Sequence, residues 1–379
     1  MHTLNDLADP AKAPRLVLKV GSALLVESGG PRAAWIAALV AEIAAARARG
    51  QQVIVVSSGA IALGARRLGL EKGGRGSLAD AQAAAAVGQI ELSGLWAASL
   101  ATHGLTAAQL LLTLDDLEDR RRYLNATATL TRLLDAGAVP VVNENDSVAT
   151  QEIRFGDNDR LAARVAQAAQ ASAVVLLSDV DGLYDRHPRE PGAQLLPVVR
   201  GVDNRIRAMA SADSGSGMGS GGMVSKLQAA EIAGRAGIAL VIANGTVEAP
   251  IARALGLAGA PAVGTLFLPA TRGRRGRKAW LGGRLRLKGQ IAIDAGAARA
   301  LASGASLLAA GITAVEGVFG RGDPVAIHGA DGVVIAHGLS EYDAAECAAL
   351  LGRQSGEHAA ILGYAPRSAI VHRDQLVLL

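Results

Sequence analysis

Two lysines occupy positions where an ammonium group can bind phosphate. Lys19 stands near the end of the apolar segment 15–20 and is followed by Gly21, and Lys226 follows a glycine-rich stretch. Lysine is the rarer basic residue, at 6 against 32 arginines, and its compact charge can follow a moving phosphoryl group where arginine is a rigid fork. Because a buried lysine is costly without an anion, we interpret Lys19 as a phosphate ligand. The alternative is an edge lysine whose ammonium reaches solvent.

The glycine-rich stretch is the most specific local feature of the chain. Residues 214–226 (SGSGMGSGGMVSK) hold five glycines and lead into a predicted helix at 223–236. Such a loop exposes backbone N–H groups that can surround phosphates. It lacks the Gly-x-x-x-x-Gly-Lys-Ser/Thr pattern of a Walker A loop and the preceding strand of a dinucleotide-binding turn. A flexible linker is the alternative interpretation.

Four polar segments are further candidates for ligand binding. Each also has an ordinary structural interpretation as a helix N-cap, a solvated loop or a turn. After a buried strand or at the start of a helix, hydroxyl, amide and carboxylate groups can instead bind a carboxylate, a zwitterion or a phosphate. The segments are 57–60 (SSGA), 143–146 (NEND), 156–159 (GDND) and 178–184 (SDVDGLY). In the third of them, Asp159 is a candidate to orient a lysine.

Apolar segments alternate with alanine-rich segments over the first two thirds of the chain. Runs such as VIVV, VVLL and LVIA are continuously apolar, which is typical of strands buried on both faces of a mainly parallel sheet. We therefore predict an α/β fold, a three-layer sandwich that binds ligands beyond the carboxyl ends of its strands. Predicted strands are 15–20, 52–57, 105–112, 138–143, 173–178, 238–243 and 263–268; predicted helices are 32–49, 78–100, 119–136, 159–170 and 223–236.

A second, smaller domain is predicted after Pro269. Residues 271–278 (TRGRRGRK) are basic and interrupted by glycine, which is typical of a linker or an exposed loop. Beyond Arg284, short β-type segments alternate with glycine turns (LRLKGQIAI, GITAVEGVF, DPVAIHG, GVVIAHG, SAIVH). The predicted organisation is a first domain at 1–268, a basic linker at 269–283 and a small β-rich domain at 284–379.

The net charge of +4 comes from one segment of the chain. Residues 249–293 carry nine basic and no acidic side chains; without them, 29 basic residues face 34 acidic ones, a net charge of −5. Aromatic residues make up only 3% of the chain, which argues against a stacking platform for single-stranded nucleic acid. We therefore do not expect nucleic acid to be the general ligand of the chain.

Several other classes of protein are disfavoured by the sequence. The single cysteine, Cys347, permits no intrachain disulfide and is most simply a small core residue. The seven histidines form no zinc-binding pattern, and no Gly-x-Ser-x-Gly nucleophile motif is present. Asp6 and Asp9 stand where a signal peptide would be apolar, and no apolar run reaches the ~18–20 residues of a membrane helix. We expect a cytoplasmic protein without a membrane partner.

Taken in order, these segments resemble the glutamate 5-kinases of the amino acid kinase family, and the resemblance covers nearly the whole chain. It implies the amino acid kinase fold for the first domain and a PUA domain for the tail. Ser22 and Ser178 stand where threonine is expected, and both keep the hydroxyl. The segments that carry the resemblance are 19–22 (KVGS), 57–61 (SSGAI), 142–146 (VNEND), 155–159 (FGDND), 178–179 (SD), 182–184 (GLY), 219–230 (GSGGMVSKLQAA), 361–364 (ILGY) and 371–374 (VHRD).

The resemblance implies a specific reaction and specific roles. ATP, with Mg²⁺ on its phosphates, would phosphorylate the side-chain carboxylate of L-glutamate to glutamyl 5-phosphate, the first step of proline biosynthesis, under possible feedback by proline. Glutamate contacts are implied at Ser58, Asp146 and Asn158, and catalytic roles at Lys19, Lys226 and Asp159. ATP contacts are implied at Lys19, Ser178, Asp179, Ser220, Gly221, Gly222, Met223, Val224, Ser225 and Lys226.

The implied chemistry suits these residue types. A carboxylate nucleophile is ionised at neutral pH and needs no general base, so catalysis consists of positioning and charge neutralisation. The two lysines would neutralise charge, and Asp159 would orient them. A sibling kinase for acetylglutamate, aspartate, carbamate or UMP remains an alternative, as does an RNA-binding or RNA-modifying protein using the PUA-like tail and the basic stretch. We expect a homo-oligomer, dimer or tetramer; the metal ligands stay open.

Overall fold

The computed structural model of the chain describes residues 1–27, 30–148, 157–211, 222–259, 261–270, 287–367 and 369–379. It divides into two compact units. The first comprises Met1–Glu118 and Ala126–Arg272, and the second comprises Asp119–Asn125 and Gly273–Leu379. Each unit is described by itself below.

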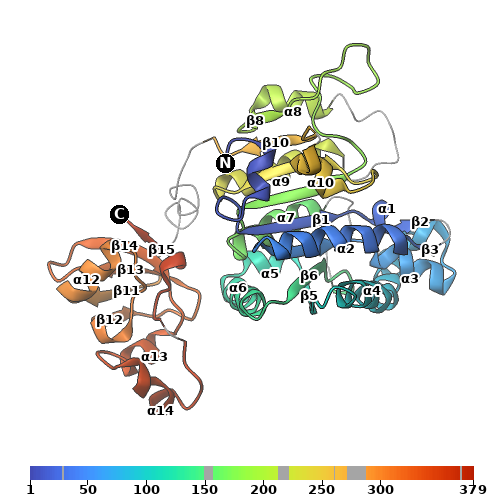
Figure 1. The fold of residues 1–379 in the computed structure, drawn as a ribbon. Coiled ribbons are helices and arrows are strands. Elements are labelled where there is room, and N and C mark those ends of the chain that lie inside the picture. Colours follow the sequence, from blue (N-terminus) through green and yellow to red (C-terminus); the bar gives the residue numbers. More distant parts are fainter. Residues whose placement is uncertain (28–29, 149–156, 212–221, 260, 271–286, 368) are drawn as a thin grey trace. The chain divides into compact units, whose positions relative to one another are not determined.

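The first unit is built on an eight-stranded sheet of order β5-β6-β4-β1-β7-β9-β10-β8 (Figure 1). Every neighbouring pair is parallel except β9 and β10, which run antiparallel. The predicted mainly parallel sheet is thereby confirmed. The strands are β1 (Arg15–Val20), β4 (Gln52–Ser57), β5 (Ala107–Leu112), β6 (Val139–Glu144), β7 (Ala173–Ser178), β8 (Val198–Arg200), β9 (Ala239–Asn244) and β10 (Thr265–Leu268).

Helices cover both faces of this sheet, which gives the predicted three layers. On one face α2 (Ala33–Ala48), α4 (Leu78–Ala101) and α10 (Pro250–Leu255) share a core with alternate residues of the strands. On the other face lie α7 (Asp157–Ala168) and α9 (Met223–Arg235), which contact the central strands. The remaining helices are α1 (Ser22–Leu25), α3 (Ala60–Leu68), α5 (Leu114–Glu118), α6 (Arg120–Asp135) and α8 (Asn204–Ser211), and β2 (Val26–Glu27) pairs with β3 (Gly30–Pro31).

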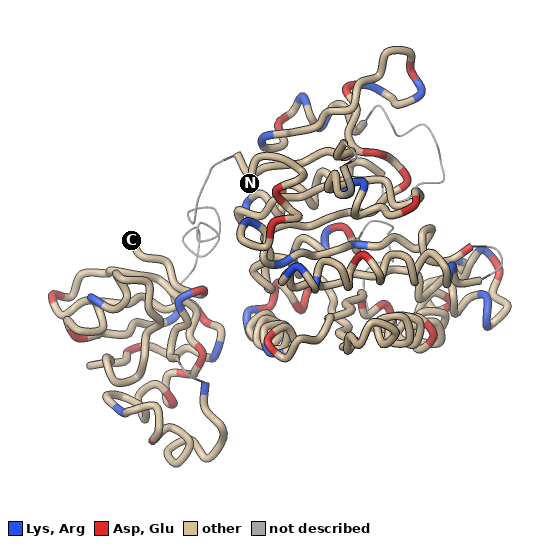
Figure 2. The backbone as a smooth tube through the Cα atoms, viewed as in Figure 1, with Lys and Arg blue, Asp and Glu red and all other residues tan. Residues whose placement is uncertain are grey.

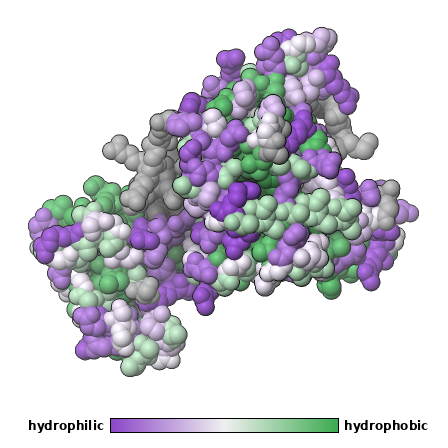
Figure 3. All heavy atoms as spheres, viewed as in Figure 1, coloured by the Kyte–Doolittle hydropathy of each residue, from purple (hydrophilic) through white to green (hydrophobic). Residues whose placement is uncertain are grey.

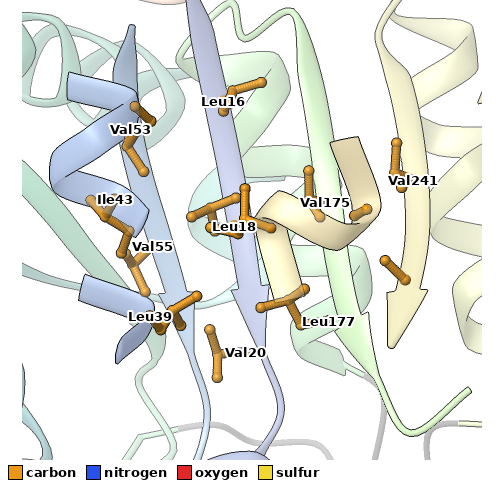
Figure 4. Packing of buried hydrophobic residues seen from close by; sticks show 14 of the residues in the cluster. Leu16, Leu18, Val20, Leu39, Ile43, Val53, Val55, Val175, Leu177 and Val241 are labelled. Carbon is orange, nitrogen blue, oxygen red and sulfur yellow. The ribbon is translucent and has the colours of Figure 1, made fainter. Parts of the chain in front are cut away.

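Side-chain alternation along β1 decides which residues reach which layer. Leu16, Leu18 and Val20 pack with Leu39 and Ile43 of α2 in the hydrophobic core (Figure 4). Because successive strand residues point to opposite faces, Lys19 points to the other layer, where α7 and α9 begin. The strand thus carries its lysine toward the first turns of two helices.

Most predicted elements end within two residues of the observed ones, and the omissions are short. In the first unit the helices α1, α3, α5, α8 and α10 and the strands β2, β3 and β8 were not among the predicted ranges. Helix α10 shows why: the N–H groups of Ile251 and Ala252 donate to the carboxylate of Glu42 in α2, at 3.2 and 2.6 Å. Two local signals were present, Pro250 in the first turn and Gly256 after the last residue, but the side chain that caps the helix lies about two hundred positions away in the chain.

The second unit is a five-stranded sheet of order β12-β11-β13-β14-β15 with its own core, as expected for a small β-rich domain. The strand predicted at 368–372 was wrong. Among the described residues of that range, only Val371 pairs with another segment, in a single bridge to Leu307. The last strand is formed by the segment that follows it. The elements are β11 (Gly289–Ile293), α12 (Ala295–Ala302), β12 (Ile312–Gly317), β13 (Pro324–His328), β14 (Val334–Leu339), α13 (Ala344–Ala349), α14 (His358–Leu362) and β15 (Leu376–Leu378).

Cys347 belongs to the core of the second unit. It is fully buried, and its thiol lies 3.7 Å from the hydroxyl of Ser340. Burial raises the pKa of the Cys347 thiol to about 12. A thiol in such a setting stays protonated and unreactive at neutral pH.

Charged residues of both signs are interspersed along the first unit (Figure 2). The viewed surface alternates hydrophilic and hydrophobic patches (Figure 3), since helices such as α2 present alanines outward. In the part of the chain that the structure describes, no helix combines the length and hydropathy required to cross a bilayer.

Two glycines allow α3 and α4 to cross in close contact. An added Cβ on Gly88 of α4 would overlap the carbonyl oxygen of Ala60, and one on Gly64 of α3 would overlap that of Ala84. Ala60 follows directly on Ser58 and Gly59, so this crossing fixes the turn at the end of β4.

Gly88→Ala should destabilise the protein by about 1–3 kcal/mol, the usual cost of overpacking a tight contact. Gly94→Ala on the same helix is the matched control, because a Cβ added at Gly94 would meet no atom within 4 Å. The control should gain up to about 1 kcal/mol from helix propensity. Chemical denaturation of both variants measures the difference; equal stabilities would contradict the tight crossing.

Candidate functional site

A buried carboxylate bridges two ammonium groups at the centre of the first unit. Lys19 Nζ lies 2.6 Å from Asp159 Oδ1, and Lys226 Nζ lies 3.3 Å from Asp159 Oδ2. The Asp159 side chain is 1% exposed, and the two lysine side chains are 11% and 12% exposed. β1, α7 and α9 each contribute one of these charges, so a net positive charge is held where three elements converge.

The pKa of Asp159 reflects two opposed effects. Burial raises the pKa of this carboxyl, but the ammonium groups of Lys19 and Lys226 outweigh it, and the net pKa lies below the usual range. Asp159 is therefore ionised at neutral pH and is no proton acceptor. It holds both lysines in place.

A chain of side-chain amides lies beside this centre. Asn158 Nδ2 donates to Ser58 Oγ at 2.7 Å and to Asn143 Oδ1 at 3.3 Å. Asn143 Nδ2 in turn donates to Gln89 Oε1 at 2.8 Å. The ends of β4 and β6 and the start of α7 are thereby joined to α4. Ser58 and Asn158, two of the residues implied by the resemblance, are in direct contact.

Asp146 lines a cavity of about 430 Å³ between α4, β5 and the end of β6. It is largely buried. Arg75 is its electrostatic neighbour: partial burial lowers the pKa of the Arg75 guanidinium, and the Asp146 carboxylate acts in the opposite direction. Further lining residues are Gln89, Ile90, Gln109 and Ser147. A cavity of this size, with amides and a carboxylate on its wall, suits a small polar ligand.

Ser178 and Asp179 lie at the carboxyl end of β7. Ser178 Oγ donates to Asp179 Oδ1 at 3.0 Å, and the Ser178 carbonyl accepts from Gly245 N at 2.7 Å. The following turn is anchored to β10, because Leu183 N donates to the buried hydroxyl of Thr265 at 2.8 Å. Hydrogen bonds therefore hold the backbone on both sides of this turn.

The glycine-rich stretch is described only from Gly222 onward. Gly222 precedes α9, Met223 is buried, and Val224 and Ser225 open the helix before Lys226. Ser220 and Gly221, which the sequence also suggested, lie outside the described residues.

The sequence did not single out all the residues found here. Gln89 and Arg75 stand in or before an alanine-rich helix without any surrounding motif, and Thr265 stands in an apolar strand. Their involvement depends on tertiary contacts. A weak signal existed for Thr265, since a buried polar residue in a strand needs a partner.

The geometry suits transfer of an anionic group to an anionic acceptor. Paired ammonium groups held by a buried carboxylate provide preorganised positive charge. Beside them, hydroxyl, amide and carboxylate groups are available to orient a small ligand.

Comparisons with known proteins identify two families along the chain. Residues 14–244 match the amino acid kinase family, and residues 289–362 match the PUA domain. The chain is 70% identical to the glutamate 5-kinase of Novosphingobium aromaticivorans over 99% of both chains. It is 62% identical to that of Sphingopyxis alaskensis, over 99% of this chain and 100% of the relative. It is 54% identical to the glutamate 5-kinase of Zymomonas mobilis, over 98% of this chain and 92% of the relative.

Asp159→Asn should lower the free energy of unfolding by about 3–5 kcal/mol at pH 7, because it leaves two lysines facing a neutral amide. The folded-state pKa of Asp159 is depressed, so its contribution is present above the unfolded value of about 3.9 and is lost as the pH falls through the folded value. The difference between variant and wild type should therefore shrink below about pH 4. Denaturant titrations at several pH values measure it.

Glu231→Gln provides the control for this experiment. Glu231 also contacts two cations, Arg207 at 2.9 Å and Arg235 at 3.5 Å, but both arginines are exposed. Its loss should cost about 1 kcal/mol or less. An Asp159→Asn variant no less stable than this control would show that the buried bridge is not a stabilising interaction.

Proposed function

Because the chain belongs to the amino acid kinase family, and within it to the glutamate 5-kinases, we propose that it transfers the γ-phosphoryl group of ATP to the side-chain carboxylate of L-glutamate. The product is glutamyl 5-phosphate, which opens proline biosynthesis. The observation that carries this proposal is the pair of ammonium groups held by the buried Asp159, because the reaction brings two anions together.

In this mechanism Lys19 and Lys226 neutralise charge on the transferring phosphoryl group. The carboxylate nucleophile is already ionised, so no side chain has to remove a proton. Asp159 keeps both lysines aimed at one position and stays ionised throughout. Ser178, Asp179 and the backbone N–H groups at the start of α9 are our candidates to bind the remainder of ATP.

Mg²⁺ is the metal we expect to accompany ATP. It favours phosphate oxygens, water and one or two carboxylates. The described residues fit a metal held mainly by ATP, because Asp159, the buried carboxylate between the two lysines, already faces two ammonium groups. Its chemistry would be neutralisation of phosphate charge.

Asp146 is our candidate to bind the α-ammonium group of glutamate. It is a buried carboxylate on the wall of a cavity that Gln89 also lines, and Gln89 is linked to Asn158 through Asn143. An ammonium buried without a partner costs several kcal/mol, so a kinase for the free amino acid needs an anion here. Arg75, the neighbour of Asp146, would favour the α-carboxylate of the same zwitterion.

The domain boundaries, the inhibitor and the cellular location are further parts of the proposal. We propose domain boundaries at 1–268, 269–283 and 284–379; the PUA match at 289–362 lies within the last of these ranges. We also propose proline as a feedback inhibitor and the cytoplasm as the location, because the resemblance to the glutamate 5-kinases implies them. RNA binding by the tail is the second candidate function, favoured only by the basic stretch before it.

We further propose that the protein self-associates through α4 and the edge strand β5. Ile90, at the middle of α4, is 78% exposed, and the three leucines of β5 are only partly buried on an edge strand. Exposed small residues lie four, seven and eleven positions before and after Ile90: Ala86 and Gly94, Ala83 and Ala97, Ala79 and Ala101. Such a face is self-complementary in an antiparallel two-fold pairing.

The substrate assignment predicts that free glutamate and N-acetylglutamate behave differently. With ATP and hydroxylamine, which traps an acyl phosphate, the wild type should turn over glutamate and barely use the acetylated compound, whose amide leaves Asp146 unpaired. Asp146→Asn should raise KM for glutamate at least about tenfold and leave KM for ATP nearly unchanged. The measurement is kcat/KM for both compounds on both proteins.

Asp135→Asn, at the exposed end of α6, is the matched control and should keep wild-type constants. Comparable kcat/KM values for the two substrates on the wild type would overturn the role given to Asp146. If hydroxylamine traps no hydroxamate at any glutamate concentration, the proposed function is wrong.

Ile90→Glu should weaken self-association at least about tenfold, because a two-fold pairing would bring two added carboxylates together. Sedimentation velocity at matched concentrations reports the change from an oligomer to a 38.4 kDa monomer. The control is Ala41→Glu on the outer face of α2, where an exposed alanine receives the same charge. Unchanged sedimentation of Ile90→Glu would place the interface elsewhere.

A further inference from the structure

The amide chain next to Asp159 has a direction. Each amide has one oxygen, which accepts, and one nitrogen, which donates. Gln89 presents its oxygen to Asn143 Nδ2, so Asn143 presents its oxygen to Asn158 Nδ2. Asn158 Nδ2 is thereby directed at Asn143 and Ser58, and its own oxygen points away from both. The orientation of one amide fixes that of the next two.

The last atom of this chain has no partner in the described structure. Asn158 Oδ1 is buried and makes no hydrogen bond with any described residue. An unsatisfied buried acceptor costs about 1–3 kcal/mol, so it marks a place where a ligand donor is expected. Ser58 Oγ accepts from Asn158, which leaves the Ser58 hydroxyl hydrogen available to donate to a ligand acceptor.

Gln89 is well placed to act as the fixed end of the chain. It lies on α4 directly after Gly88, whose close contact with Ala60 holds α4 against the turn that carries Ser58. Asn143, the residue it contacts, is 2% exposed. Gln89 also lines the cavity that contains Asp146. A buried amide such as Asn143 has two orientations, and its neighbours decide between them.

We propose that Gln89 is a positioning residue for substrate recognition: it orients Asn143 and Asn158 so that Asn158 Oδ1 accepts a hydrogen bond from the α-ammonium group of glutamate. This inference rests on the proposed function and deepens it. Asn158 Oδ1 and the Asp146 carboxylate would then both serve the ammonium, while the Ser58 hydroxyl donates to a carboxylate of the same substrate. In the reversed orientation Asn158 would present N–H groups, which repel an ammonium.

The test compares Gln89→Met, which keeps the length of the side chain but has no strong acceptor, with Gln89→Glu, which keeps the acceptor oxygens. Gln89→Met should raise KM for glutamate about tenfold or more, with KM for ATP unchanged. Gln89→Glu should stay within about threefold of wild type, since it still accepts from Asn143. Gln82→Met, on the same helix, is the control for a glutamine-to-methionine change and should behave like wild type.

Glutarate, which is glutamate without its amino group, separates recognition from general damage to the site. Measured as a competitive inhibitor, it should bind wild type and Gln89→Met within about threefold of each other, because no ammonium is present to be recognised. Equal losses for glutamate and glutarate, or an unchanged KM in Gln89→Met, would overturn the inference. Failure of the wild type to phosphorylate glutamate would instead overturn the proposed function.

Discussion

A lysine at the end of a buried strand has to find a negative charge, and much of the first unit follows from that requirement. Lys19 is 8% exposed, and burying its charge without Asp159 would be costly. The same carboxylate also contacts Lys226. One buried aspartate therefore ties β1 to the first turns of α7 and α9. Because those helices begin at the carboxyl edge of the sheet, the positive charge is held where parallel sheets bind ligands.

The substrate side of the site depends on a different constraint, the absence of side chains where α3 crosses α4. Gly64 and Gly88 let backbone meet backbone, and this contact holds the Ser58 turn and Gln89 at a fixed separation. Hydrogen bonds from Asn158 through Asn143 to Gln89 then span that separation. Helix packing and side-chain polarity thus act together: the first sets the distances, and the second decides which atoms a ligand meets.

The two sides of the sheet edge differ in how their loops are held. The turn after β7 is anchored by Thr265 and Gly245 through hydrogen bonds to its backbone. Around Asp146, by contrast, the wall of the cavity is made of side chains from α4, β5 and β6. A backbone-lined site suits phosphate groups, which all nucleotides share. Side-chain walls suit discrimination among small acceptors, because one unpaired polar group is enough to reject a wrong ligand.

The sequence alone determined the succession of strands and helices along the first unit, because continuously apolar runs indicate strands covered on both faces, and polar residues at the ends of parallel strands meet at one edge. Lys19 was recognisable because a buried lysine is costly without an anion, Lys226 because it follows a glycine-rich stretch, and Asp159 because it lies in a polar segment that opens a helix. The tertiary structure alone decided the rest. The first N–H groups of α10 donate to Glu42, about two hundred positions away in the chain. The strand expected around Val371 forms only one bridge, and Leu376–Leu378 is instead the last strand of the second sheet. Gln89 looked like any polar residue of an alanine-rich helix, because hydrogen-bond direction exists only once three segments far apart in sequence have been packed together.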